Sequence, residues 1–318
     1  MIYQSLTKDK AIEKSKAGSE QSSLQIIQKI KAYSLLAVLS LIWGVAFVAI
    51  RVADFELSPV NLTLLRWFIA GAGYLVLLPF LGRSKTRFET KDLPRLIVVS
   101  FANVPAYHLS LNYAETTVSA GLAGLLISLG PVFIVIFSRI SLKESIGTTV
   151  IVALSLATLG AVLLSFSDLN GTTESLAGPI EVVITALAYA VFAVLSKPLV
   201  HKYGSLPIAI RAGTIGTVML LPLLSRSFVA QVSAMSEIGW FSVLYLSLLS
   251  TVLGYSMFYT LVSKSAVSRL SIQLYLIPIV SVISGVVLLG EKVSAFTVVG
   301  GAALLFAIAL ATRQQSRR

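Results

Sequence analysis

Polar side chains inside long apolar segments are the residues of this chain that could do chemistry. Such groups are costly in a membrane interior, so each is a candidate for binding, gating or ion transfer. In the segment 94–114, Asn103 and Tyr107 share one helical face, whereas His108 and Asn112 share another. Either face could line a cavity, and a later segment repeats the pattern of the first. The expected cavity residues are Trp43, Asn103, Tyr107, His108, Asn112, Thr251, Tyr255, Tyr259, Arg269 and Gln273.

These residue types predict recognition of a small molecule. Tyr107 and Tyr255 would offer hydroxyls to orient a ligand and rings to contact its apolar part, although packing between helices explains them too. Histidine ordinarily titrates near neutral pH, so His108 is the candidate for coupling transport to protons. Exchange of one substrate for another and downhill movement of substrate are left open. Arg269 and Gln273 share a face and could receive a substrate carboxylate. Simple extension of Arg269 toward the membrane surface is the alternative.

Two arginines also lie inside apolar segments, where an unpaired charge is expensive. We expect Arg66 to form an ion pair or a gate with Glu115 or Glu181, and Arg211 to be its counterpart on the opposite side. Direct contact between Arg66 and substrate is the alternative.

Two prolines and two glutamates recur at the same separation, Pro131 with Glu144 and Pro278 with Glu291. Each proline is expected to kink its helix. Each glutamate is expected to open the next helix, where free N–H groups and the helix dipole favour a carboxylate. A long repeat of this kind indicates duplication of a multi-helix unit.

The composition places the chain in a lipid bilayer. Hydrophobic residues make up 56% of its 318 residues and charged residues 12%, with a mean hydropathy of +0.88, which excludes a soluble domain. The absence of cysteine excludes disulfides and thiolate metal sites. The net charge of +11 comes from linkers and tails, so membrane topology explains it better than nucleic-acid binding. We expect no metal, no cofactor and no enzymatic activity, because no paired aspartates, zinc motif or P-loop is visible.

Ten apolar runs are long enough to cross the cell membrane as helices. Basic residues collect in alternate linkers, which predicts cytoplasmic termini. The sequence therefore predicts an all-α integral membrane protein with a cytoplasmic tail (1–31), a first five-helix repeat (33–165) and a second repeat (176–312). Because five spans is an odd number, the second repeat is inverted relative to the first. Inverted repeats with a site between them are typical of secondary transporters.

A set of motifs occurs in order along this duplicated frame. They are Trp43-Gly44, Arg66, Gly130-Pro131, Glu144, Pro278 and Glu291. Together they resemble the EamA repeat, and over about residues 33–312 the chain is similar to ten-helix members of the drug/metabolite transporter superfamily. The resemblance implies a monomeric or homodimeric carrier of small metabolites, often amino acids, that commonly exports them.

Three other functions remain as alternatives: a carrier of nucleotide-linked or phosphorylated sugars, a lipid flippase and, less favoured, an intramembrane enzyme. Related nucleotide-sugar carriers have Phe-Tyr-Asn-Asn and Gly-Ala-Leu-Asn-Lys segments, which this chain lacks. Its spans also hold few of the cations that surround phosphate in sugar-phosphate carriers. A highly charged substrate is therefore not expected.

Overall fold

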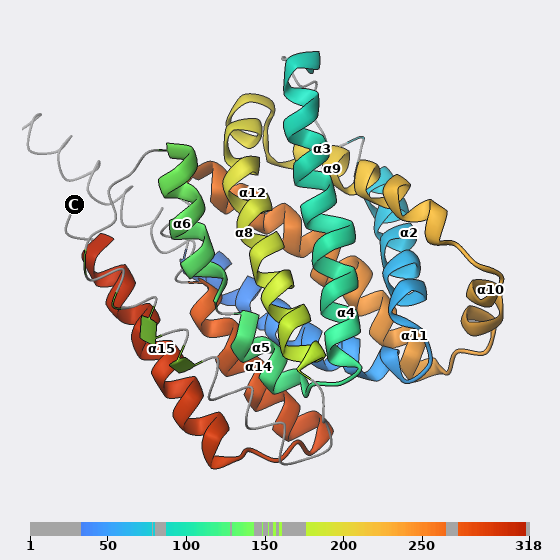
Figure 1. The fold of residues 1–318 in the computed structure, drawn as a ribbon. Helices are drawn as coiled ribbons and strands as arrows, with labels where there is room; N and C mark the ends of the chain where they lie inside the picture. The colour runs from blue at the N-terminus through green and yellow to red at the C-terminus, as the bar shows by residue number, and fades with distance from the viewer. Residues whose placement is uncertain are drawn as a thin grey trace, which may run out of the picture. The chain divides into compact units, whose positions relative to one another are not determined.

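In the computed structural model all regular secondary structure of the described residues is helical, and no strand occurs among them (Figure 1). It describes residues 33–77, 79, 87–127, 129–142, 148, 152, 155–156, 159–160, 176–264 and 273–315. The expected tail (1–31), Glu144 and Arg269 lie outside these residues.

The helices follow the apolar runs of the sequence. In chain order they are Tyr33–Asp54, α2 (Pro59–Leu77), η2 (Thr90–Asp92), α3 (Leu93–Phe101), η3 (Ala102–Leu109), α4 (Ser110–Glu115), α5 (Ala120–Ile127), α6 (Gly130–Leu142), α8 (Ala177–Tyr203), α9 (Ser205–Leu220), η4 (Leu221–Leu223), α10 (Arg226–Ser233), α11 (Glu237–Leu244), η5 (Tyr245–Leu253), α12 (Gly254–Lys264), α14 (Gln273–Leu289) and α15 (Ala295–Gln315).

Six helices in the described part of the chain are long and apolar enough to cross a membrane. They are Tyr33–Asp54, Pro59–Leu77, Ala120–Ser141, Ala177–Tyr203, Ser205–Leu223 and Glu237–Ser263. Large apolar side chains such as Val76, Phe241, Val287 and Phe306 are exposed on the outside of the helices, as expected for a surface that faces lipid. The predicted all-α membrane fold is confirmed, whereas the count of ten spans and the inversion stay predictions.

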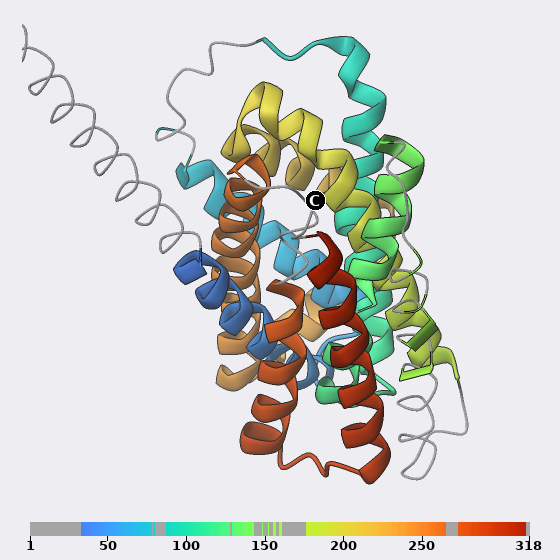
Figure 2. The same cartoon turned by 90° about the vertical axis from the view of Figure 1, so that its left-hand side faces the viewer.

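Contacts group the chain into two units, Met1–Val38 and Leu39–Arg318. Within the second unit, helices of the first sequence repeat pack mainly on helices of the second. For example, α8 packs on α4, η3 and α6, whereas α14 packs on α5 and η5 packs on α2 (Figures 1 and 2). A space enclosed by these contacts is therefore lined from both repeats.

Two of the long helices widen into a π-helix in their middle. The helical run 93–115 does so at η3, which contains Pro105, and the run 237–264 does so at η5. In η3, Pro105 lacks a backbone N–H and so disturbs the regular hydrogen bonding of the helix. In η5, the Thr251 hydroxyl donates to the Leu246 carbonyl at 2.8 Å. Such segments are frequent at functional sites, and here both contribute to one cavity.

Candidate functional site

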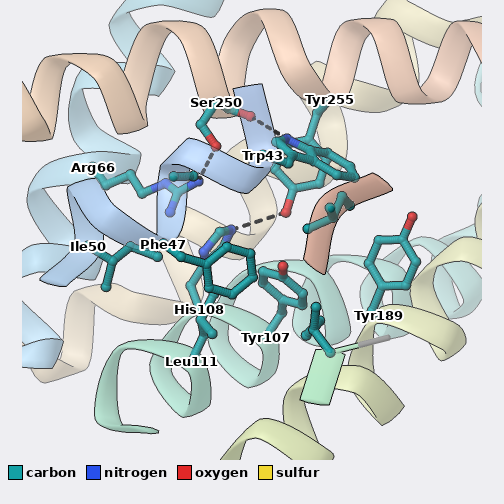
Figure 3. Close-up of a pocket in the computed structure, with 13 residues that line it drawn as sticks. Trp43, Phe47, Ile50, Arg66, Tyr107, His108, Leu111, Tyr189, Ser250 and Tyr255 are labelled. Atoms are coloured by element: carbon teal, nitrogen blue, oxygen red, sulfur yellow. Dashed lines mark hydrogen bonds between the residues drawn. The ribbon is translucent and has the colours of Figure 1, made fainter. Parts of the chain in front are cut away.

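The site is a cavity enclosed by the first helix, α2, η3, α4 and α5 on one side and by α8, η5, α12 and α14 on the other (Figure 3). The space inside it that the centre of a water molecule can reach is about 30 Å³, and the total unfilled space of about 450 Å³ includes the part that opens toward solvent. Thirteen of the described residues line it, and most of them are aromatic or aliphatic. An apolar cavity with a few polar groups is the usual form of a small-molecule site.

Aromatic rings form much of the wall. The ring centroid of Trp43 lies 5.5 Å from that of Tyr255 and 6.2 Å from that of Tyr189, and Tyr107 lies 6.1 Å from Tyr189. The Trp43 indole N–H donates to the Ser250 carbonyl at 3.0 Å, which holds the ring against η5. The rings thus come from both repeats and present faces and edges to the cavity.

His108 lies beside these rings and is fully buried. Its Nε2 is 3.2 Å from the Tyr255 hydroxyl, and its ring is 5.3 Å from Trp67 and 4.8 Å from Tyr107. Its Nδ1 has no hydrogen-bond partner among the described residues. One nitrogen is therefore held by a tyrosine from the other repeat, and the second is left for another partner.

Arg66 is the one arginine among the described lining residues, and it is 3% exposed. Its Nε donates to Thr251 Oγ1 at 2.8 Å, and its Nη2 donates to Ser250 Oγ at 3.1 Å. The π-helix η5 carries both hydroxyls, and they take the place of the carboxylate expected from the sequence. Glu115 is buried with both carboxylate oxygens unpartnered among the described residues, and no ion pair of Arg66 or Glu181 occurs among them.

The other residues singled out from the sequence are distributed around the cavity. Asn112 donates to the Thr63 hydroxyl at 2.9 Å and so ties α4 to α2. Asn103 and Tyr259 are buried, each with a polar atom that lacks a partner in the described part of the chain, and neither lines the cavity. Arg211 lies over the Phe88 ring, 5.4 Å from its centroid.

Three further residues are placed by their helices. Gln273 begins α14, Pro131 lies in the first turn of α6, and Pro278 is a buried residue inside α14. Pro278 is not among the lining residues.

Phe47, Tyr189 and Ser250 line the cavity but are not among the expected residues. Tyr189 had a signal in the sequence, because the duplicated frame aligns Tyr189-Ala190 with Trp43-Gly44. Phe47 follows Trp43 by about one helical turn. The sequence gives no signal for Ser250, because a serine hydroxyl in an apolar segment usually forms a hydrogen bond with the backbone of its own helix.

Glu291 caps a helix, although not the one that follows it. Its Oε1 accepts from the Ala120 N–H at 2.8 Å and its Oε2 from the Gly121 N–H at 3.0 Å, at the start of α5. The sequence placed this carboxylate at the start of the next span, which begins at Ala295. The cap thus links the second repeat to the first.

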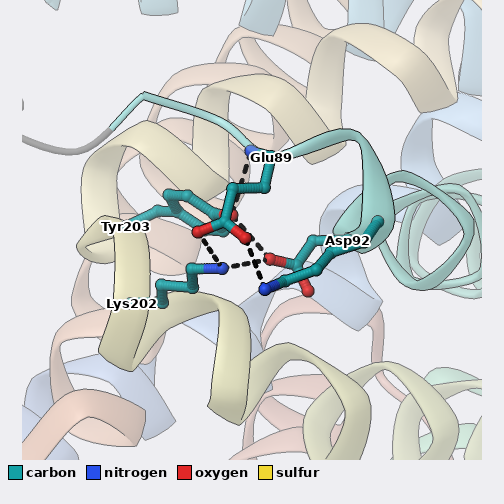
Figure 4. A network of polar contacts seen from close by, with 5 residues as sticks. Glu89, Asp92, Lys202 and Tyr203 are labelled. Atoms are coloured by element: carbon teal, nitrogen blue, oxygen red, sulfur yellow. Dashed lines mark hydrogen bonds and ion pairs between the residues drawn. The ribbon is translucent and has the colours of Figure 1, made fainter.

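A second link between the repeats is an ion network, shown in Figure 4. Lys202 near the end of α8 reaches Asp92 at 2.7 Å and Glu89 at 2.6 Å, and the Tyr203 hydroxyl donates to Asp92 at 2.6 Å. The bond from Lys202, followed by that from Lys91, holds the pKa of the Glu89 carboxyl below its usual range. The bonds from Lys202 and then Tyr203 lower the pKa of Asp92 in the same way.

We expect this network to be insensitive to pH between about pH 5 and 8. A lowered carboxyl pKa stabilises the fold above the ordinary value of about 4, and that contribution is lost as pH falls through the lowered pKa. Lys202→Met should lower the thermal midpoint of the purified protein throughout this range. Lys91→Met is the control, because Lys91 is 73% exposed and, in the described part of the chain, forms an ion pair with Glu89 but not with Asp92. Equal shifts in both variants would contradict a central role for Lys202.

The comparisons with known proteins agree with this architecture. The EamA-like transporter family matches residues 30–166 and 176–313. An "Uncharacterized transporter" of Archaeoglobus fulgidus is 32% identical over 90% of this chain and 100% of its own length. A "Probable terminal-alkyne amino-acid exporter" of Streptantibioticus cattleyicolor is 30% identical over 89% and 94%. A "Probable amino-acid metabolite efflux pump" of Salmonella typhimurium is 22% identical over 85% and 91%.

One solved crystal structure has the same fold, with a TM-score of 0.64 at 19% identity over 90% of this chain and 98% of that chain. The family match covers most of the residues on both sides of the cavity, in two copies. The chain is therefore a multi-pass membrane protein of the EamA-like transporter family, a transporter and not an enzyme.

Proposed function

We propose that this protein is a secondary active carrier that exports small metabolites such as amino acids. In this proposal ten helices form two inverted five-helix repeats with cytoplasmic termini, and the repeats rock about the central cavity. The observation that carries it is the cavity lined from both repeats. In the single-cysteine variants Lys143→Cys and Lys292→Cys, we expect the two cysteines to be labelled from opposite sides of the membrane. Labelling of both from the same side would contradict the inversion.

Two features support a small substrate with little charge. The names of two relatives refer to amino-acid export. Among the described residues, the lining holds a single arginine and no lysine, whereas a phosphorylated or nucleotide-linked sugar would call for several cations. These alternatives are therefore disfavoured.

Proton coupling is the finer part of the proposal, and His108 is its candidate. The bond between Nε2 and the Tyr255 hydroxyl, together with an Nδ1 that has no partner within the described ranges, would let a change of protonation alter a contact between the repeats. Exchange of one substrate for another is the alternative, and it needs no titrating group.

The test is counterflow of labelled amino acids into liposomes that contain the purified protein. We expect uptake against unlabelled substrate, and Tyr255→Phe should slow it up to about tenfold because one hydrogen bond across the cavity is lost. Tyr113→Phe is the matched control, since Tyr113 is 48% exposed on α4. An imposed pH gradient should stimulate the wild type but not His108→Gln. Absence of counterflow with a broad panel would reject the carrier function, and indifference to the gradient would reject the coupling.

A further inference from the structure

We propose that the cavity binds a carboxylate that carries an aromatic or bulky apolar body, with the Nη1 edge of Arg66 as the anchor. This inference rests on the proposed function and narrows its substrate class. In an amino acid, binding requires the carboxylate and does not require the ammonium group.

The Arg66 guanidinium is oriented so that one of its edges is left for a ligand. Thr251 and Ser250 accept from Nε and Nη2, so two of the three nitrogens are held against η5. Nη1 is buried and has no partner among the described residues. In Figure 3 the guanidinium reaches toward Phe47 and His108. A planar fork that is held on one side and free on the other suits a carboxylate.

The charge of the cavity favours an anionic ligand. Arg66 is 3% exposed, and no carboxylate occurs among the described lining residues. The two hydroxyls satisfy hydrogen bonds but do not neutralise the charge. Buried Glu115 interacts with Arg66 electrostatically, but no ion pair joins them among the described residues. A buried cation without a carboxylate in direct contact is unfavourable, so an anionic ligand that contacts Arg66 is stabilised, whereas a cationic ligand is repelled.

The aromatic rings of the lining indicate which chemical group is attached to the carboxylate of the ligand. Phe47, Tyr107, Tyr189 and Tyr255 line the same cavity as Arg66. Their faces and edges suit an aromatic or aliphatic body. Aromatic faces can also attract an ammonium group, but here the positive charge of Arg66 opposes it. The ammonium of a zwitterion is therefore tolerated at best.

Three compounds with the same phenyl ring separate these contributions. They are 3-phenylpropionate, which has only the carboxylate, phenylalanine, which has both groups, and 2-phenylethylamine, which has only the ammonium. Binding to the purified full-length protein can be followed by tryptophan fluorescence, because Trp43 lines the cavity. We expect 3-phenylpropionate to bind at least as tightly as phenylalanine, and 2-phenylethylamine to bind at least about tenfold more weakly than either because it lacks the charge-assisted bond. Equal binding of the amine and the carboxylates would overturn the proposal.

Arg66→Gln should weaken binding of 3-phenylpropionate about tenfold or more, because the charged partner is lost. Arg66→Lys keeps the charge without the fork and should recover part of the affinity. Arg211→Gln is the matched control: Arg211 also has an unpartnered Nη1 among the described residues but does not line the cavity. Full affinity in folded Arg66→Gln would overturn the proposal, and the three compounds test it on the wild type even if that variant fails to fold.

Failure of this inference is distinguishable from failure of the proposed function. Counterflow of amino acids without a preference for the carboxylate compounds would reject the anchor role of Arg66 and leave the carrier function intact. Arg66-dependent binding of 3-phenylpropionate without counterflow of any compound would support the anchor and reject the carrier function.

Discussion

We expect Gly124→Ala to give a much lower yield of folded protein than the wild type. A Cβ at Gly124 would lie 2.2 Å from Ser281 Oγ and 2.3 Å from Ser281 Cβ, where α5 packs on α14. Ser281 is held in place, because its hydroxyl donates to the Ala120 carbonyl at 2.6 Å. The two helices must therefore move apart, and overpacking of this kind typically costs about 1–3 kcal/mol.

The measurement is the yield of monodisperse protein in detergent together with its thermal midpoint. Gly71→Ala is the matched control, because a Cβ at Gly71 meets nothing within 4 Å. Both variants replace a helical glycine by alanine, so any gain in helix propensity is shared. If both unfold at the same temperature, the close approach of α5 and α14 is not what stabilises the fold.

Glu291→Ala should destabilise the junction between the repeats. It removes the acceptors of the Ala120 and Gly121 N–H groups at the start of α5. An N–H left without a partner away from water costs about 1–3 kcal/mol, so we expect a clear fall in the thermal midpoint. Glu291→Gln should fall between the alanine variant and the wild type, because its amide has one oxygen to accept with.

The exposed neighbour Lys292 supplies the control, and Lys292→Ala should leave the midpoint unchanged. Gly285 supplies an independent test, because a Cβ there would lie 2.3 Å from Glu291 Oε2. Gly285→Ala should displace the carboxylate and have a smaller effect in the Glu291→Ala background, as coupled sites do. Strictly additive losses would show that the carboxylate does not act through the cap.

The faces of the third span show how far periodicity can place a site. A regular α-helix places Tyr107 and His108 on different faces, and the sequence predicts this arrangement. The structure places both on the cavity, together with Leu111, whereas Asn103 and Asn112 lie elsewhere. The reason is η3, which spans both residues: a π-helix has more residues per turn, so neighbours lie closer in angle than in an α-helix.

Residue type and spacing along the chain were sufficient to predict the membrane class, the duplication, the family motifs and the presence of Trp43, Tyr107 and Tyr255 in the cavity lining. These properties depend on apolar run length and on repetition, which are visible without contacts. The partners of the charged residues were decided by the tertiary structure alone. Arg66 meets the hydroxyls of Ser250 and Thr251, and Glu291 caps α5. A buried charge accepts any suitable donor or acceptor within reach, and only the packing of distant helices determines which one that is.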